Sequence, residues 1–512
     1  MHQKAAKKDW LSRIEDLGNK LPDITMLFIY ATIICWLLSW GLSYISFDYI
    51  NPITKAKLAV TNLFQPDEIL AFLTSLIKNF VNFPPLGITI VATLGIGIAE
   101  ASGFINVGLS KALHIIPKKI VTPAVVFISV IAHVVSDSSY VILMPVAALV
   151  FYSVGKHPLA GIASSFAGLA GGFSASFTPS IIDPIIQSFT QSAAHIIDPS
   201  YNVNVLGNYY VSFVSAFFVI LVCWYITDKI VEPRLQQHMP IAKDINPEDT
   251  TVHKPSELDN KAFRIASLVF LAIAAGLFLL AYPDNSVLRD STGSLTSPKA
   301  PMMQLIVPLL LIFFAVPSLV HGKIAKTFDS PRAVTKSMEK ITHSLVAFIV
   351  FSFFAAQFLY SFNRSGIGTL IALSGAEFLK ALAMPAGITI FGILILTLIL
   401  NIIITSATSK WAILSAIFVP MLMSVNIAPE LTQAAFRISD SVMNVSTPMF
   451  AFYPLLISYC QRYCPQTGVG TLCSMMIPYT IGLFIVLTIV MYAFWGLDIP
   501  LGIDSSYVYP KV

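Results

Sequence analysis

Long apolar runs separated by short polar segments make up most of the chain. Each run has about the length that a helix needs to cross a hydrocarbon core of about 30 Å. We expect membrane-spanning helices at about 24–46, 83–107, 209–227, 265–282, 303–320, 341–361 and 472–496. The first run lacks the small-residue cleavage site of a signal peptide, so we expect it to be retained as a helix.

Two further apolar segments carry polar residues at their centres, and we interpret each as a re-entrant hairpin. The first, 121–153, has Ser136, Asp137 and Ser138 in its middle, and the second is 386–424. A hairpin keeps the basic residues that flank 121–153 on one side of the membrane, whereas a full crossing would separate them. Non-helical backbone at a hairpin tip is tolerated where it lines a wet cavity enclosed by protein.

A broken helix is predicted after each hairpin. The segment 158–195 contains glycines, serines, Thr178-Pro179 and Asp183 before a second proline, and this composition interrupts a helix. The segment 429–460 is interrupted in the same way at Thr447-Pro448. Counted with the seven uninterrupted runs, the two broken helices predict about nine crossings.

The two units of hairpin and broken helix form an internal repeat. Alignment of Ser138 with Ser409 also places Pro158 over Pro429. Because the first hairpin is entered from inside and the second from outside, the units are expected to have opposite orientation. Inverted repeats with broken helices are typical of secondary transporters. We therefore predict an all-α polytopic membrane protein with about nine transmembrane helices, two re-entrant hairpins and an elevator-like carrier fold.

Composition supports this class and excludes others. Hydrophobic residues make up 56% of the 512 residues and charged residues only 11%, so a soluble globule is excluded. The net charge of +4 is small and spread over connecting segments, so we expect no nucleic-acid partner. The five cysteines have no metal-site or disulfide spacing and are expected to be packing residues.

The distribution of basic residues orients the chain. Most of the 31 Lys and Arg residues fall in the segments that this topology places inside, notably in 1–22, 228–264 and 321–340. We therefore expect a cytoplasmic N-terminus and a periplasmic C-terminus. Lys410 and Arg437 are the basic residues that remain within the membrane.

Oxygen-bearing side chains at the hairpin tips and helix breaks are candidates for cation or proton coupling. A hard cation such as Na⁺ prefers carboxylate, hydroxyl and carbonyl oxygens. The first unit offers Asp137, Ser138, Ser176 and Asp183, and the second offers Asn401, Asp440 and Asn444. We expect a possible Na⁺ site at Asp440, Asn401, Asn444 and Asp183. The alternative for each hydroxyl is that it satisfies backbone freed at the helix break.

Charged and aromatic residues of the second unit are candidates for substrate binding. Arg437 or Lys410 would meet a substrate carboxylate, and Trp411 would stack on an aromatic ring. The alternative for Arg437 is a structural ion pair with Asp440, three residues later in the helix. Glu100 and His133 are weaker candidates. Glu100 sits among Gly95, Gly97 and Gly103, where close helix approach is the ordinary explanation.

Several motifs resemble the AbgT, or p-aminobenzoyl-glutamate transporter, family. They are Gly18-Asn-Lys-Leu-Pro22, Gly171-Gly-Phe-Ser-Ala, Ile182-Asp-Pro184, Lys410-Trp-Ala-Ile-Leu, Phe418-Val-Pro-Met and Arg437-Ile-Ser-Asp-Ser-Val. The resemblance implies functional roles for Asp183, Asn401, Thr408, Trp411, Pro429, Arg437, Asp440 and Pro448. Thr405, Ser439, Met443 and Ser176-Phe-Thr depart from the pattern of the family.

The resemblance also implies a function. It implies a homodimeric protein of the bacterial inner membrane that moves p-aminobenzoyl-glutamate, a folate catabolite, by alternating access. The partners would be the lipid bilayer and a small molecule, an aromatic amide of glutamate or a sulfonamide. Symport driven by Na⁺ and/or H⁺ is expected, with no other cofactor. Sulfonamide efflux driven by the proton motive force is the alternative.

Two other classes remain as alternatives to a carrier. An ion channel would use the same polar hairpin tips but would conduct passively. An intramembrane aspartyl protease would pair Asp183 with Asp440 or Asp137, but no flanking motif of such enzymes is present. We expect a transporter and not an enzyme. The segments assigned are 1–22 (N-terminal), 23–120 (scaffold), 121–197 (first transport repeat), 198–385 (scaffold), 386–460 (second transport repeat) and 461–512 (last helix and C-terminus).

Overall fold

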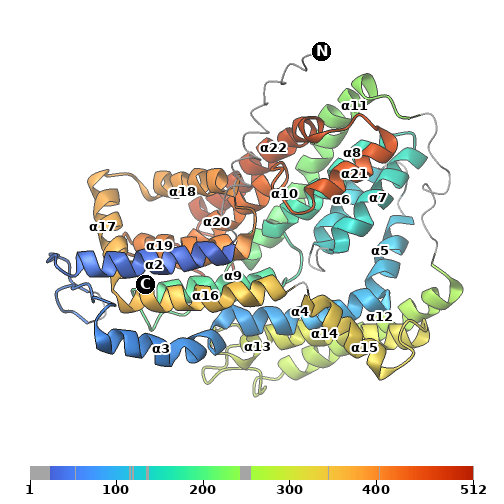
Figure 1. Cartoon of the computed structure of the whole chain (residues 1–512). Coiled ribbons are helices and arrows are strands. Elements are labelled where there is room, and N and C mark those ends of the chain that lie inside the picture. The colour runs from blue at the N-terminus through green and yellow to red at the C-terminus, as the bar shows by residue number, and fades with distance from the viewer. Residues whose placement is uncertain are drawn as a thin grey trace, which may run out of the picture.

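The computed structural model describes residues 24–51, 54–114, 117, 120–133, 138–242, 255–343, 345–402 and 404–510. Within these residues the chain is helical, and β-structure is limited to two isolated bridges, Ile50 with Lys57 and Ile427 with Val508 (Figure 1). The expected N-terminal segment 1–22 lies outside the described residues. The predicted all-helical class is confirmed.

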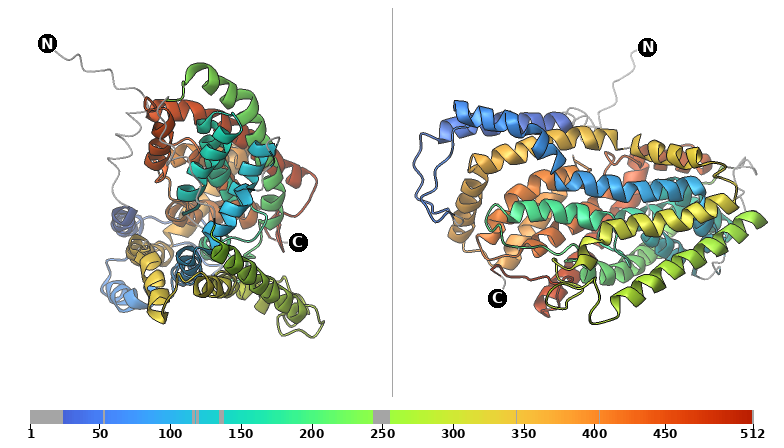
Figure 2. Two further views of the ribbon diagram at one scale, coloured as in Figure 1. Left: turned by 90° about the vertical axis from the view of Figure 1, so that its right-hand side faces the viewer. Right: turned by 90° about the horizontal axis from the view of Figure 1, so that it is seen from below.

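One group of helices, here called the scaffold layer, packs side by side (Figures 1 and 2). Its centre is α4, which contacts α14 and α15, while α16 contacts α2 and α3. The layer consists of α2(Ile24–Leu42), α3(Pro66–Val81), α4(Pro84–Ser102), α5(Phe104–His114), α12(Glu257–Ala281), α13(Pro301–Gln304), α14(Ile306–Ile324), α15(Pro331–His343) and α16(Val346–Arg364).

The second group, here called the hairpin unit, contains both predicted hairpins and both broken helices. The first repeat is α6(Val121–Ala132), α7(Ser138–Ser153), α8(Pro158–Gly171), the 3-10 turn η2(Gly172–Ser174) and α9(Ile182–Ala194). The second repeat is α18(Ala386–Asn401), α19(Ala407–Met423), α20(Pro429–Asn444) and α21(Tyr453–Tyr463). Apart from η2, the same order of helices occurs in both.

The remaining helices flank the hairpin unit. α10(Tyr209–Ile226) packs against α6 and α22(Val469–Gly496), and α22 packs against α20. α17(Ile367–Ala381) follows α16 and packs against α19. A π-helical turn, η3(Thr227–Val231), and α11(Glu232–His238) continue α10.

Burial places the broken helices at the centre of the molecule. Every residue of α8 is buried, whereas in α12 the buried residues are Ala262 and Ala266. Seven helices of the described ranges are long and apolar enough to cross a membrane. Each overlaps one of the seven uninterrupted runs that the sequence predicts as crossings, and several extend beyond the predicted bounds. The chain is a multi-pass membrane protein.

Two connecting segments contain more helix than the sequence indicated. The basic segment expected at 321–340 forms the end of α14 and most of α15. The charged segment expected at 228–264 contains η3, α11 and the start of α12, where Ser256 and Asp259 form a reciprocal N-terminal cap. Capping residues at the start of an apolar run lengthen a helix into its polar flank.

Candidate functional site

A cavity of about 630 Å³ lies between the scaffold layer and the hairpin unit. The scaffold contributes side chains of α4 and α15, and the hairpin unit contributes its tips and helix breaks. The lining residues are Thr93, Ile96, Glu100, His133, Tyr140, Ala170, Phe173, Ser180, Ile181, Ile182, Ile341, Leu345, Thr405, Ser406, Ala407, Thr408, Asn444, Phe450, Ala451 and Phe452. Lys and Arg are absent from this lining, as far as the chain is described.

Two helices begin at the wall of this cavity. Residues 406–408, which line it, form the N-cap and first turn of α19, and residues 181–182 do the same for α9. The first N–H groups of a helix have no partner inside the helix, and its dipole adds positive potential there. The cavity wall therefore attracts anions at two separate points.

Aromatic side chains form another part of the wall. The ring of Tyr140 stacks on that of Phe452 with centroids 4.5 Å apart, and Phe450 lies edge-on to Tyr140 at 5.7 Å. Phe173 contributes a further ring, which lies edge-on to His133 at 6.1 Å. Flat apolar surfaces of this kind bind the face or edge of an aromatic ring.

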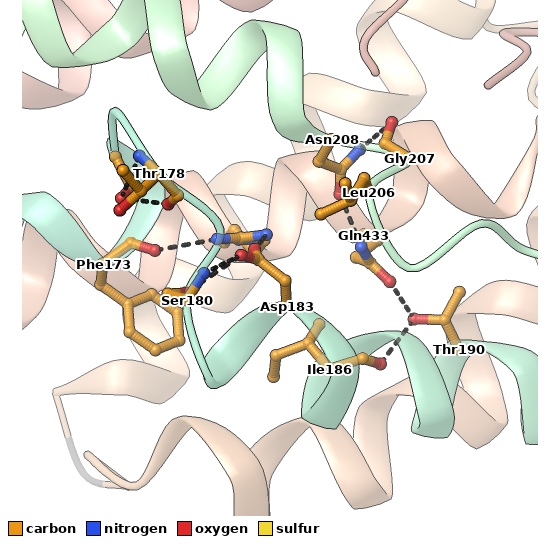
Figure 3. Close-up of polar contacts among 12 residues, drawn as sticks. Phe173, Thr178, Ser180, Asp183, Ile186, Thr190, Leu206, Gly207, Asn208 and Gln433 are labelled. Atoms are coloured by element: carbon orange, nitrogen blue, oxygen red, sulfur yellow. Dashed lines mark hydrogen bonds and ion pairs between the residues drawn. The ribbon is translucent and has the colours of Figure 1, made fainter. Parts of the chain in front are cut away.

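Next to the cavity-lining residues Phe173 and Ser180, Arg437 of α20 forms an ion pair with Asp183 of α9. Figure 3 shows Asp183 together with Phe173 and Ser180. Nη1 of Arg437 lies 2.6 Å from Asp183 Oδ1, and Nη2 donates to the main-chain oxygen of Phe173 at 3.2 Å. The other carboxylate oxygen of Asp183 accepts from the N–H of Ser180 at 2.7 Å and from its hydroxyl at 3.1 Å. Asp183 thus holds Ser180, which lies just before α9, and joins the two repeats.

A second buried ion pair joins α19 to α20. Lys410 Nζ lies 2.5 Å from Asp440 Oδ1, and the side chains are 1% and 0% exposed. Lys410 also donates to Asn401 Oδ1 and to the main-chain oxygen of Ile404. Asn444 Nδ2 donates to the other oxygen of Asp440 at 3.1 Å. Neither member of this pair lines the cavity.

Trp411 belongs to a polar chain that also joins the repeats. Its ring stacks on Phe436 at 4.3 Å, and its Nε1 donates to the Thr190 hydroxyl at 2.9 Å. Thr190 donates to Gln433, and Gln433 donates to Asn208 at 2.7 Å (Figure 3). Trp411 is fully buried.

Two cavity-lining side chains have a buried polar atom with no partner among the residues that the structure describes. These atoms are Asn444 Oδ1 and His133 Nε2. A buried acceptor without a partner is destabilising unless a ligand or water satisfies it. Asn444 Oδ1 is therefore positioned to accept a hydrogen bond from a bound molecule.

The structure brings together only part of the predicted site. Thr408 and Asn444 line the cavity, whereas Asp183, Lys410, Arg437 and Asp440 form two ion pairs away from its lining. Asn401 accepts a hydrogen bond from Lys410 and does not line the cavity either. The Ser176 hydroxyl donates to the nearby Thr178 carbonyl. Pro429 is the buried first residue of α20, and Pro448 lies between α20 and α21. Asp137 and the side chain of Ser138 lie outside the described residues.

Sequence reasoning did not single out several cavity residues. They are Thr93, Tyr140, Phe173, Ser180, Ser406, Phe450 and Phe452. Most of them adjoin a predicted hairpin tip or helix break, so proximity to these breaks was the available signal. Glu100 and His133, which were weaker candidates, also line the cavity.

Comparisons with known proteins agree with this architecture. A family model described as the AbgT putative transporter family matches residues 9–509. The p-aminobenzoyl-glutamate transport protein of Escherichia coli (strain K12) is 32% identical over 499 residues, which cover 98% of this chain and 96% of that protein.

Two solved structures are similar over nearly the whole chain. The crystal structure of the Alcanivorax borkumensis YdaH transporter has a TM-score of 0.88 at 34% identity, covering 94% of this chain and 100% of its own. Neisseria gonorrhoeae MtrF, described as illuminating a class of antimetabolite efflux pumps, has a TM-score of 0.90 at 35% identity, covering 98% and 100%. The likeness extends to both sequence and fold.

Proposed function

This chain belongs to the AbgT putative transporter family, and on that premise we propose that it is a secondary active transporter of p-aminobenzoyl-glutamate. It moves this substrate across the bacterial inner membrane by alternating access, driven by a gradient of Na⁺ and/or H⁺. Its N-terminus is cytoplasmic and its C-terminus periplasmic, and it works as a homodimer. The family and the similar proteins above are transporters, in agreement with the expectation that the chain is not an enzyme.

The observation that carries this proposal is the wall of the cavity. p-Aminobenzoyl-glutamate has two carboxylates at one end and a benzoyl ring at the other. The starts of α9 and α19 provide two anion-attracting points, and half-helix N-termini bind anionic groups in other transporters. The rings of Tyr140, Phe450 and Phe452 provide the aromatic surface.

Asn444 supplies a directional contact for the same substrate. Its Oδ1 is buried at the cavity wall and accepts no hydrogen bond from the described part of the chain. The amide N–H or the aromatic amine of the substrate would donate to it. This contact also selects against an analogue without a donor, because the acceptor would then stay unsatisfied.

The contacts between the repeats indicate what moves. Arg437 with Asp183, Trp411 with Thr190, and the hydroxyls of Ser174 and Ser441 join the two repeats through buried polar groups. Breaking such contacts during transport would leave polar groups unpaired in a membrane. We therefore expect the hairpin unit to move as one body against the scaffold layer, with the cavity at their boundary.

The test is flux of radiolabelled p-aminobenzoyl-glutamate in proteoliposomes, with Na⁺ and pH gradients imposed separately. We expect saturable uptake that depends on one of the gradients. Asn444→Leu should raise KM at least tenfold, since it removes the acceptor, whereas exposed Asn285→Leu in the loop after α12 is the matched control. Flux that is independent of both gradients and does not saturate would indicate a channel and contradict the proposal.

Efflux of sulfonamide-type antimetabolites is a second candidate function. It is favoured by the likeness to MtrF and by the lack of Lys and Arg among the described cavity-lining residues. A sulfonamide with an aromatic amine needs the aromatic surface and Asn444 but only one of the two anion-attracting helix starts. Extrusion of a labelled sulfonamide that a protonophore abolishes, without transport of p-aminobenzoyl-glutamate, would establish this function in place of the first.

A further inference from the structure

The Lys410 ammonium group is held in the way that a protein holds a small bound cation. Nζ lies 2.5 Å from Asp440 Oδ1, donates to the Ile404 main-chain oxygen at 2.9 Å, and donates to Asn401 Oδ1. An ammonium group has three N–H donors and no acceptor. One ion pair and two hydrogen bonds therefore give it three oxygen partners in a position that is shielded from solvent.

The three oxygens come from separate parts of the second repeat. Asn401 is the last residue of α18, Ile404 lies in the hairpin tip, and Asp440 is in α20. Asn401 Nδ2 donates to the Asp440 main-chain oxygen at 2.6 Å, and Asn444 Nδ2 donates to Asp440 Oδ2. These contacts do not involve Lys410, so the oxygen cage is held in place independently of the lysine.

The cage has the ligand chemistry expected for Na⁺. A carboxylate, a side-chain amide oxygen and a main-chain carbonyl are oxygen ligands that hard cations prefer. Asn401, Asp440 and Asn444 are three of the four residues from which a Na⁺ site is predicted, and the structure brings them together. The fourth, Asp183, forms its ion pair with Arg437 instead.

The predicted Na⁺ site and the structure disagree at the centre of the cage, because Lys410 Nζ takes that position. A second cation there would contact the ammonium directly, and like charges at such a distance repel strongly in a buried environment. Nζ is also within contact distance of all three oxygens, so the centre of the cage has no room for a further cation while the lysine is in place.

We propose that the Lys410 ammonium is a tethered cation that takes the place of a sodium ion between Asn401, Ile404 and Asp440. Na⁺ is excluded from this position while the lysine is in it, so a sodium gradient is not sensed here. The lysine, which is a residue of α19, compensates the charge of Asp440 in α20, as a bound ion would otherwise do. This inference rests on the proposed function only in taking the chain as a cation-coupled carrier.

The test replaces the ammonium and measures Na⁺ binding on purified, full-length protein without any substrate. Lys410→Met shortens the side chain by the terminal nitrogen and removes its charge, which leaves Asp440 uncompensated in an open cage. We expect this variant to bind one more ²²Na⁺ per chain than the wild type. Its melting temperature should fall in choline chloride and rise by several degrees with saturating NaCl at constant ionic strength.

The matched control is the double variant Lys410→Met/Asp440→Asn, which removes both charges and leaves no buried ion unpaired. It should lose the additional Na⁺ and show the same sodium response as the wild type. No additional Na⁺ in Lys410→Met would overturn the proposal. So would a smaller sodium response in the double variant than in the wild type, because the wild type would then bind Na⁺ at Asp440.

The comparison of the double variant with the wild type does not need a folded Lys410→Met protein, so the proposal stays testable if that single variant is unstable. Since both measurements are made without substrate, they are also independent of the flux assay. A protein that fails to transport p-aminobenzoyl-glutamate can still show the sodium binding expected here. A protein that transports this substrate can likewise lack it.

Discussion

Arg437 and Lys410 are basic side chains buried at the centre of a membrane protein, and each is compensated by one carboxylate. Removing one member of such a pair leaves an uncompensated buried charge, which is strongly destabilising, whereas removing both members is far less so. The pair of Arg437 and Asp183 is 4% and 9% exposed, so this asymmetry applies to it.

The effects of single and double substitutions of this pair on the free energy of unfolding are therefore expected to be non-additive. Asp183→Asn or Arg437→Gln alone should destabilise the protein by about 3–5 kcal/mol. The double variant should be more stable than either single variant. Thermal unfolding in one detergent measures this, and additive losses of stability would contradict the contact. Transport is expected to be lost in all three variants, because the pair joins the two repeats.

The partners of these charges were not predictable from residue spacing. Arg437 and Asp440 are three residues apart in one helix, which favours an intrahelical pair. In the structure Arg437 meets Asp183, 254 residues away, and Asp440 meets Lys410. That choice depends on how α9, α19 and α20 pack against each other, and apolar periodicity carries no information about it.

At the scale of elements, α4 approaches its neighbours closely at glycine. A Cβ atom on Gly95 would lie 2.9 Å from the main-chain oxygen of Leu311 in α14, and one on Gly97 would collide with Ile341 of α15. Small residues allow helices to approach in this way in membranes. Because the obstacle at Gly95 is backbone, a larger residue there must separate the helices.

We expect Gly95→Ala to destabilise the protein by about 1–3 kcal/mol, as overpacking does. Gly87 lies in the same helix, and a Cβ atom added to it would meet nothing within 4 Å, so Gly87→Ala is the matched control. It should be neutral or slightly stabilising, since alanine has the higher helix propensity. Equal melting temperatures of the two variants would argue against close packing of α4 on α14.

The start of α8 depends on a neutral histidine. His157 Nδ1 accepts from the N–H of Leu159, and Nε2 contacts the Met239 main-chain oxygen at 2.8 Å. Burial lowers the pKa of His157 below its ordinary value of 6.5, outweighing the opposite effects of the Met239 carbonyl and of Glu232. Protonation would remove the cap and place positive charge at a helix N-terminus.

Lowering the pH should therefore destabilise the folded protein through His157. Because the pKa of His157 is lower in the folded protein, its contribution to stability is complete above pH 6.5 and is lost as the pH falls toward the folded-state pKa. Asn is a good N-cap that does not titrate, so His157→Asn should retain more of its stability between pH 7 and 5 than the wild type does. Parallel melting profiles would contradict this role of His157.

The succession of elements was more predictable than their contacts. The runs 121–153 and 386–424 correspond to the pairs α6 with α7 and α18 with α19, because polar residues at the centre of an apolar run mark a hairpin tip. The packing of α10 and α22 on the hairpin unit was not indicated, because both are apolar on every face. The same limit applies to Phe450 and Phe452, whose role at the cavity depends on α7 facing them.

At the scale of the whole molecule, the cavity lies on the boundary between two bodies. Thr93 of the scaffold layer and Thr408 of the hairpin unit both line it. A cross-link between these positions should prevent relative movement while each body remains folded. The five native cysteines are buried, so they compete little for a thiol reagent.

We expect a cleavable cross-linker with two thiol-reactive groups to reduce transport by the variant Thr93→Cys/Thr408→Cys in proteoliposomes to background. Cleavage of the linker should restore it. Each single-cysteine variant treated with the same reagent is the control, because it carries the modification without the bridge. Full transport by the cross-linked protein, verified by mass spectrometry, would show that the two bodies do not move against each other.

The pairing of Arg437 with Asp183 also affects how the protein is made. Asp183 enters the membrane when its partner, 254 residues further along the chain, has not been synthesised. At about 5–20 residues per second this interval lasts roughly 10 to 50 s. An unpaired aspartate near the bilayer centre opposes insertion by about 2.5–3.5 kcal/mol. The first repeat therefore needs protection, by the insertion machinery or by an incompletely inserted state, until α20 arrives, and chains truncated before α20 should be degraded.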